Sequence, residues 1–156
     1  MKLQTSTMLA LYSVLEAASN PDKQVSAAEI AERYDVSAHH LAKVLRELGR
    51  AGLVDSSRGV GGGYRFSGNA RRLTLMDVIE RFEDIGARSP EPGESQTDVG
   101  REIARVLSEI DEIAKATFRS ITIDTLLKVV ERDRQAQAAS ATSATSAPAL
   151  STNARR

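Results

Sequence analysis

The segment with the clearest chemical potential is rich in glycine and flanked by arginines: Arg58-Gly59-Val60-Gly61-Gly62-Gly63-Tyr64-Arg65. Glycine adopts positive φ angles at little cost and lets a backbone approach a nucleic-acid surface closely. An arginine gains from the negative potential of a narrow DNA minor groove. We therefore predict that this segment contacts DNA through Arg58, Gly59, Gly61, Gly62, Gly63, Tyr64 and Arg65.

Two other interpretations of the glycines must be weighed. The phosphate-binding loop of a nucleotide enzyme continues with Lys and Ser or Thr and opens a helix. Here neither residue follows, and Tyr64-Arg65-Phe66 predicts a strand. A merely flexible hairpin is the remaining alternative, although it would leave both flanking arginines without a role.

A second set of candidate residues lies on a predicted helix that begins at Ser37. Leu41, Val44, Leu45 and Leu48 recur at the spacing of one buried helix face. The other faces carry polar, basic or small side chains, which predicts DNA contacts from His39, His40, Ala42, Lys43, Arg46 and Arg50. Residues of the first turns would read base edges, and the arginines would meet phosphates. The plain alternative is a solvated basic face.

Catalytic and metal sites find little support in the sequence. His39 and His40 are the only histidines, and adjacent helical residues point about 100° apart, which disfavours a shared metal ion. There is no cysteine to complete such a site, although nearby carboxylates could contribute. We therefore predict no metal, no cofactor, no catalytic residue and no enzymatic activity.

Short signals along the chain define the elements that carry these residues. Thr5 or Ser6 is expected to cap a first helix reaching residue 18. Ser26 and Glu29 form a predicted capping box for a short second helix. That helix and the one after Ser37, joined by a turn of about four residues, match a helix-turn-helix. Residues 53–54 and 64–66 are predicted strands of a β-hairpin wing, with 55–63 connecting them.

A heptad-like apolar seam follows in the second half of the chain. Its members are Val99, Ile103, Val106, Ile110 and Ile113. One helix cannot bury such a seam alone, so we predict that part packs on a final helix over residues 121–130 and the rest forms a homodimer. The predicted fold is mainly α with a small β-hairpin: a winged helix-turn-helix plus a long dimerisation helix.

The domain boundaries follow from these elements. Residues 1–86 form the predicted DNA-binding domain, 87–97 a linker or sensor loop, and 98–134 the dimerisation helices. Residues 135–156 are mostly Ala, Ser and Thr and are expected to be a disordered tail.

Composition narrows the class of protein further. The 156 residues carry no net charge, yet residues 36–72 hold seven cations against two acids. Such a basic stretch is typical of a nucleic-acid partner. No apolar run is long enough to span a membrane and no signal-peptide pattern is visible, so a cytoplasmic protein without a membrane partner is expected.

Several of these motifs together resemble the Rrf2 family of bacterial transcriptional repressors. The residues that carry the resemblance lie at 28–33, 36–37, 50–54, 57–59, 61–64 and 73–79, with Leu41, Val44, Leu45 and Leu48 between them. The resemblance implies a homodimer with a long helix crossing between subunits. It also implies that Ser37, His39, His40, Ala42 and Lys43 face bases or phosphates and that Arg58 enters the minor groove.

The chain also departs from this family. Ser6-Thr7 stands where relatives often carry a basic residue and glycine, and Ala42 replaces a frequent acid. Many members bind an iron–sulfur cluster through three cysteines in the region matching 87–98, which here has none. The regulatory input would then be a small molecule, a partner protein or nothing. A winged helix serving as a protein–protein interaction module is the alternative function, and a ligand-binding enzyme a weaker third.

Overall fold

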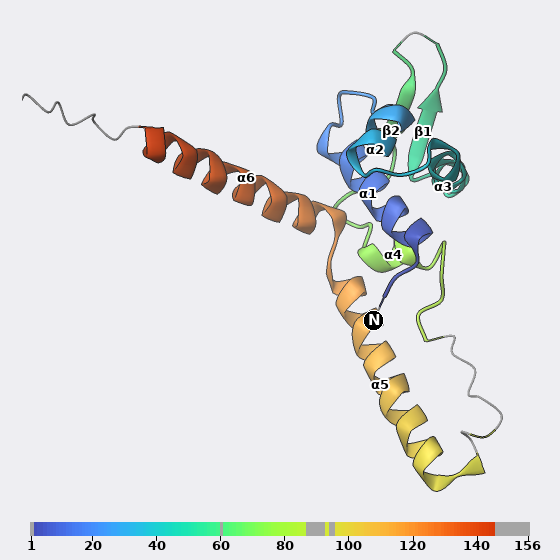
Figure 1. Ribbon diagram of the computed structural model, residues 1–156. Helices are drawn as coiled ribbons and strands as arrows, with labels where there is room; N and C mark the ends of the chain where they lie inside the picture. The colour runs from blue at the N-terminus through green and yellow to red at the C-terminus, as the bar shows by residue number, and fades with distance from the viewer. Residues whose placement is uncertain (1, 60, 87–92, 94–95, 146–156) are drawn as a thin grey trace, which may run out of the picture.

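The computed structural model describes residues 2–59, 61–86, 93 and 96–145 and shows a helical body with a hairpin at one end (Figure 1). The elements in chain order are α1 (Thr5–Ser19), α2 (Ala27–Arg33), α3 (Ala38–Arg50), β1 (Val54–Ser57), β2 (Gly63–Phe66), α4 (Leu75–Ile79), α5 (Asp98–Ser120) and α6 (Ile123–Thr145). The predicted fold class, mainly α with a β-hairpin wing, is confirmed.

Side-chain caps start the short helices where the sequence predicts them. The Ser26 Oγ accepts from the Glu29 N–H at 3.1 Å while the Glu29 carboxylate accepts from the Ser26 N–H at 2.9 Å. These bonds hold the pKa of Glu29 below its usual value. Thr74 caps α4 through the same reciprocal arrangement with Asp77. Because each cap satisfies main-chain donors, the helix starts are fixed locally.

The start of α1 differs from the prediction. Its N-cap is Gln4, in extended conformation and without a side-chain cap bond, so the expected cap by Thr5 or Ser6 is wrong. The Gln4 N–H instead donates to the Glu83 Oε1 at 3.0 Å, which ties the start of α1 to the segment after α4.

The core of the winged helix is assembled around α1, which packs against α3, α4 and the first part of α6. The predicted apolar face of α3 is fully buried there, with Leu41, Val44, Leu45 and Leu48 at 0–2% exposure. Burying such a side chain contributes about 1.5–3 kcal/mol. The face that the sequence marks as apolar therefore fixes which sides of α3 remain accessible.

The hairpin is longer than expected. β1 and β2 pair antiparallel with Val54 opposite Phe66 and Ser57 opposite Gly63. The predicted connection over residues 55–63 therefore begins only after Ser57. Ladder hydrogen bonds extend the strands past the apolar residues on which the prediction relied, because backbone pairing does not require an apolar side chain.

The junction between α5 and α6 docks on the body of the protein. The Leu75 N–H donates to the Ile121 oxygen and the Ile123 N–H to the Leu73 oxygen, both at 2.9 Å. Ile123 is fully buried, and Leu126 and Leu127 pack against the core. The expectation that part of the apolar seam of α5 packs on the final helix is wrong, because the seam residues are exposed and α5 and α6 diverge in Figure 1.

The C-terminal helix also extends further than expected. α6 continues to Thr145, so residues 135–145 are helical where a disordered tail was predicted to begin. Alanine is the strongest helix former, and here it propagates a helix already started by packed residues. Residues 146–156 and most of the 87–97 loop lie outside the described residues.

Candidate nucleic-acid interface

The outermost face of α3 is basic. His39, Lys43, Arg46 and Arg50 follow one another at intervals of four, three and four residues, which places them on one helix face, and all four are exposed. Arg50, near the C-terminal end, is paired with Glu47 at 3.3 Å. The structure therefore keeps His39, Lys43 and Arg46 as an accessible row beside the exposed N-cap Ser37.

A groove of about 720 Å³ separates α3 from the wing. It is lined by Ala42, Leu45, Arg46, Gly49, Val54, Asp55, Ser56, Ser57, Arg58, Gly63 and Tyr64. Five of the predicted DNA-contact residues thus meet around one concave surface: Ala42, Arg46, Arg58, Gly63 and Tyr64. Arg46 comes from the helix and Arg58 from the wing, so cations from two elements line the same groove.

Sequence reasoning missed several residues of this groove. Ser56 and Ser57 belong to β1, which the prediction placed in a loop, and Gly49 lies on the α3 side. The small residues Ala42 and Gly49 leave room on the helix side of the groove. The run Asp55-Ser56-Ser57 has no alternation of apolar and polar residues that would predict a strand. Its position beside the groove is therefore known only from the strand pairing.

Arg65 occupies a different place from the one expected. Successive residues of a strand point to opposite faces, so Arg65 and Tyr64 face apart. Arg65 lines a second groove on the hairpin, together with Asp22, Lys23, Gln24, Ser26, Glu29, Gly61 and Gly62. The structure therefore does not bring Arg65 together with the residues of α3.

The glycines of the wing have two different roles. Gly59 and Gly61 adopt φ angles of 105° and 77°, a region that favours glycine, and a Cβ there would meet no atom within 4 Å. A Cβ on Gly62 would lie 2.6 Å from the Ser57 oxygen, and one on Gly63 would lie 2.8 Å from the Val25 oxygen. Gly62 and Gly63 are thus required by contacts inside the protein, whatever else they touch.

The two histidines of α3 are separated by their surroundings. His39 is exposed, whereas His40 is half-buried and forms a hydrogen bond of 2.9 Å between its Nε2 and the Ser6 Oγ of α1. The structure therefore places the His40 ring against α1 and leaves His39 accessible.

A polar cluster holds α2 against α1. The Tyr12 and Tyr34 rings stack with centroids 4.3 Å apart, and the Tyr34 hydroxyl donates to the Glu16 Oε1 at 2.8 Å. Burial and this bond raise the pKa of Tyr34 to about 12. Arg33 completes the cluster through an ion pair with Glu16. These contacts fix the first helix of the helix-turn-helix, whose turn into α3 passes through Asp35 at φ 49°.

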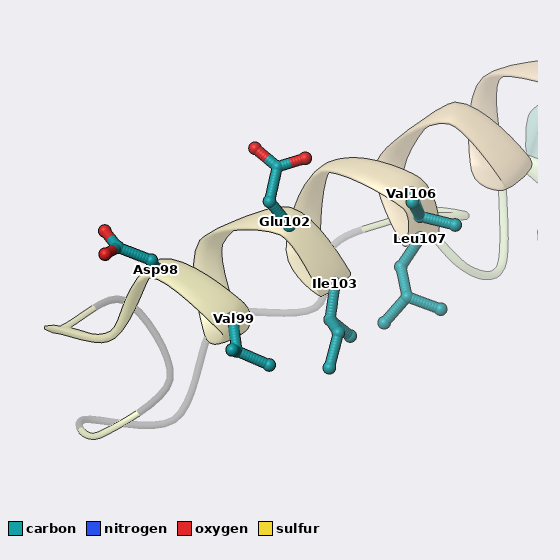
Figure 2. A pocket seen from close by; sticks show the side chains of 6 residues that line it. All are labelled: Asp98, Val99, Glu102, Ile103, Val106 and Leu107. Atoms are coloured by element: carbon teal, nitrogen blue, oxygen red, sulfur yellow. The ribbon is translucent and has the colours of Figure 1, made fainter.

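The apolar seam of α5 is open. Figure 2 shows Val99, Ile103, Val106 and Leu107 projecting from the helix on one side, while Asp98 and Glu102 project elsewhere. Exposures are 70% for Val99, 55% for Ile103, 48% for Val106, 53% for Ile110 and 67% for Ile113. Leu107, at 38%, also belongs to this face although the heptad spacing did not select it. Arg105 pairs with Glu102 and Glu109 at 3.1 and 3.3 Å on the same helix.

Together these features define a winged helix-turn-helix protein of the transcription-regulator class. Residues 3–129 match the Rrf2 family, described as an iron-dependent transcriptional regulator. The chain belongs to the Rrf2 family.

Individual relatives agree with this assignment. The chain is 54% identical over 135 residues to the HTH-type transcriptional regulator BadM of Rhodopseudomonas palustris, covering 86% of each chain. It is 36% identical over 87 residues to the HTH-type transcriptional regulator IscR of Cereibacter sphaeroides, covering 54% of this chain and 56% of that protein.

Solved structures show the same fold. CymR, the global cysteine regulator of B. subtilis, superposes with a TM-score of 0.69 at 25% identity, over 83% of this chain and 98% of the other. IscR of T. potens gives a TM-score of 0.67 at 25% identity, over 85% and 90% of the two chains.

The iron in the family description does not fit the residues of this chain. The sequence contains no cysteine, so thiolate ligation of an iron–sulfur cluster is impossible. In the part of the chain that the structure describes, no group of three or more His, Asp or Glu side chains is placed to hold a metal ion. Within that same part, no helix has the length and apolar character needed to cross a membrane.

Proposed function

We propose that this protein is a homodimeric repressor that binds a palindromic operator in double-stranded DNA. The observation that carries the proposal is the groove shared by α3 and the wing, which Arg46 and Arg58 line from opposite sides. An exposed basic helix beside a basic hairpin provides two elements for two adjacent DNA grooves.

The placement of side chains supports contacts of α3 and of the wing with different DNA grooves. α3 would enter the major groove, where His39 and Lys43 face base edges and the Ala42 methyl group can meet a thymine methyl group. The tip of the wing would bring Arg58 to the minor groove. The DNA strand between the two grooves would then pass through the gap between α3 and β1, where the Ser56 hydroxyl group and Arg46 can contact phosphates.

The open seam of α5 supports a homodimer. Exposed apolar faces of this length are rare on monomers and mark interaction sites. In a two-fold dimer the recognition helices would meet half-sites about one helical turn apart, near 34–36 Å. We propose that a dimer bound at a promoter in this way blocks access to it and so represses transcription, and that the protein acts on the chromosome in the cytoplasm.

The regulatory input must differ from the thiolate-bound cluster of many relatives. We infer a repressor without an iron–sulfur cluster or other cofactor and without catalytic activity, whose effector, where one acts, is a small molecule or a protein.

Selection of genomic DNA fragments by the purified protein, followed by sequencing, tests this function. We expect enrichment of one palindromic site, lost in Arg58→Ala and retained in Arg81→Ala, an exposed arginine after α4. Affinity should fall steeply with salt because several phosphates are neutralised per subunit. Retention of the same site by Arg58→Ala would refute the role of Arg58 alone, whereas retention of random DNA would refute the proposal and favour the protein-interaction module. In that case Arg58→Glu would leave partner binding intact.

A further inference from the structure

A side-chain contact joins the first turn of α3 to α1. The Ser6 Oγ and the His40 Nε2 form a hydrogen bond of 2.9 Å, and both residues are half-buried. The His40 main-chain N–H also donates to the Ser37 Oγ at 3.4 Å. His40 is thus held through its ring and through its backbone, while the neighbouring His39 is exposed.

This contact differs in kind from the rest of the packing between α1 and α3. The two helices pack within the apolar core, to which Leu9, Leu41 and Leu45 belong. Apolar burial is nearly non-directional, so it tolerates small rotations of one helix against the other. A hydrogen bond between two side chains fixes both a distance and a direction. The Ser6–His40 bond therefore adds a directional constraint on the first turn of α3 to the packing of the core.

We propose that Ser6 is a positioning residue for operator recognition, acting through His40 on the orientation of α3. The proposal rests on the proposed function of α3 as the recognition helix. Because Nε2 is engaged by Ser6, His40 serves as an anchor and leaves the base edges to His39 and Lys43. Recognition geometry must be held within about 0.5 Å, so losing the bond weakens the contacts made by the first turn.

A double-mutant cycle on the full chain tests the proposal. The proteins are wild type, Ser6→Ala, His40→Ala and the double variant, with Ser6→Thr as the conservative replacement and Thr5→Ala as a control at an exposed neighbour. Fluorescence anisotropy measures affinity for the selected operator and for a random duplex of equal length. Thermal unfolding of each variant is followed in parallel.

We expect Ser6→Ala to lower operator affinity roughly fivefold, the usual effect of one hydrogen bond, and to leave random-duplex affinity unchanged because no cation is lost. Ser6→Thr should restore the affinity, Thr5→Ala should match wild type, and Ser6→Ala should add nothing to His40→Ala.

Three results would overturn the proposal. Wild-type operator affinity in Ser6→Ala would show that the bond positions nothing. An equal loss in the presence and absence of His40 would show that Ser6 acts on DNA directly. Equal losses on operator and random DNA, with a lower Tm, would show a general structural role. If wild type itself prefers no sequence, the proposed function fails instead, which is a separate outcome.

Discussion

Val25 and Tyr64 exchange two main-chain hydrogen bonds, each of 2.9 Å, one in either direction. The segment between α1 and α2 thereby forms an isolated β-bridge with β2. A second contact nearby joins the Ser57 Oγ to the Gln24 Oε1 at 2.6 Å. The strands of the wing are therefore held near their loop end by the residues that precede α2.

Replacement of Gly63 tests how much the pairing with Val25 contributes to the stability of the wing. A Cβ at Gly63 would lie 2.8 Å from the Val25 oxygen, closer than real Cβ atoms come, so either the bridge or the hairpin must shift. We expect Gly63→Ala to lower the free energy of unfolding by about 1–3 kcal/mol, as overpacking does. Thermal unfolding followed by circular dichroism measures it.

Gly49→Ala is the matched control for that experiment. A Cβ at Gly49 would lie 3.7 Å from the Val54 oxygen, an ordinary contact, and alanine favours a helix over glycine by about 1 kcal/mol. Gly49→Ala should therefore raise the Tm. An unchanged Tm in Gly63→Ala would show that the wing adapts at this position and does not require glycine.

Thr7 offers a route to a more stable protein. Its hydroxyl is fully buried and has no hydrogen-bond partner among the residues that the structure describes, an arrangement that costs free energy. Thr7→Val keeps the shape and removes the unpaired group, so we expect stabilisation of roughly 1 kcal/mol. Ser13→Ala is the contrasting variant, because the Ser13 hydroxyl donates to the Leu9 oxygen at 2.7 Å. A Tm of Thr7→Val below that of wild type would contradict the prediction.

Local signals in the sequence were sufficient for the helix-turn-helix and insufficient for the wing. The reciprocal bonds of Ser26 with Glu29 and the buried face of α3 depend on residues within one or two turns, so spacing alone predicts them. The side of the hairpin on which Arg65 lies depends on strand register, which forms between residues distant in sequence.

The surroundings of α3 show the same limit. His39 and His40 are adjacent and chemically identical in the sequence, yet one is exposed and the other is hydrogen-bonded to Ser6, 34 residues away. Thr7 reads as an ordinary residue of the first helix turn, and only packing shows that its hydroxyl is buried. No local sequence pattern predicts the Ser6–His40 hydrogen bond or the burial of the Thr7 hydroxyl.

Glu16 should make the stability of the helix-turn-helix depend on pH. Burial raises the pKa of Glu16, but hydrogen bonds from Arg33 and Tyr34 and the Arg33 charge together outweigh it, so the pKa lies below 4.5. A carboxylate whose pKa is lower in the folded than in the unfolded protein stabilises the fold at pH values above the unfolded-state pKa. This contribution is lost as the pH falls through the folded-state pKa. The cluster should therefore stabilise the protein at neutral pH and weaken below about 4.5.

Glu16→Gln measures this contribution. The substitution removes the charge, so we expect the free energy of unfolding at pH 7 to fall by roughly 1 kcal/mol. This difference from wild type should shrink as the pH falls below about 4.5. Urea unfolding at pH 7 and at pH 4 gives both values. Glu32→Gln, at an exposed residue of α2, should match wild type at either pH. If the difference in unfolding free energy between Glu16→Gln and wild type grew in acid, the pKa of Glu16 would be raised by folding and the prediction would be wrong.

The exposed seam of α5 provides the sharpest test of assembly. Ile110 lies at its middle and is 53% exposed in the single chain, so a charge there is tolerated by the folded monomer. In a homodimer closed by this seam, Ile110→Glu buries an unpaired carboxylate, at a cost of several kcal/mol. We expect this variant to sediment as a monomer where wild type sediments as a dimer, and to lose roughly a hundredfold in operator affinity because its two half-site contacts are no longer linked. Val129→Glu, on the exposed side of α6, should remain dimeric. A dimeric Ile110→Glu would place the subunit interface away from α5.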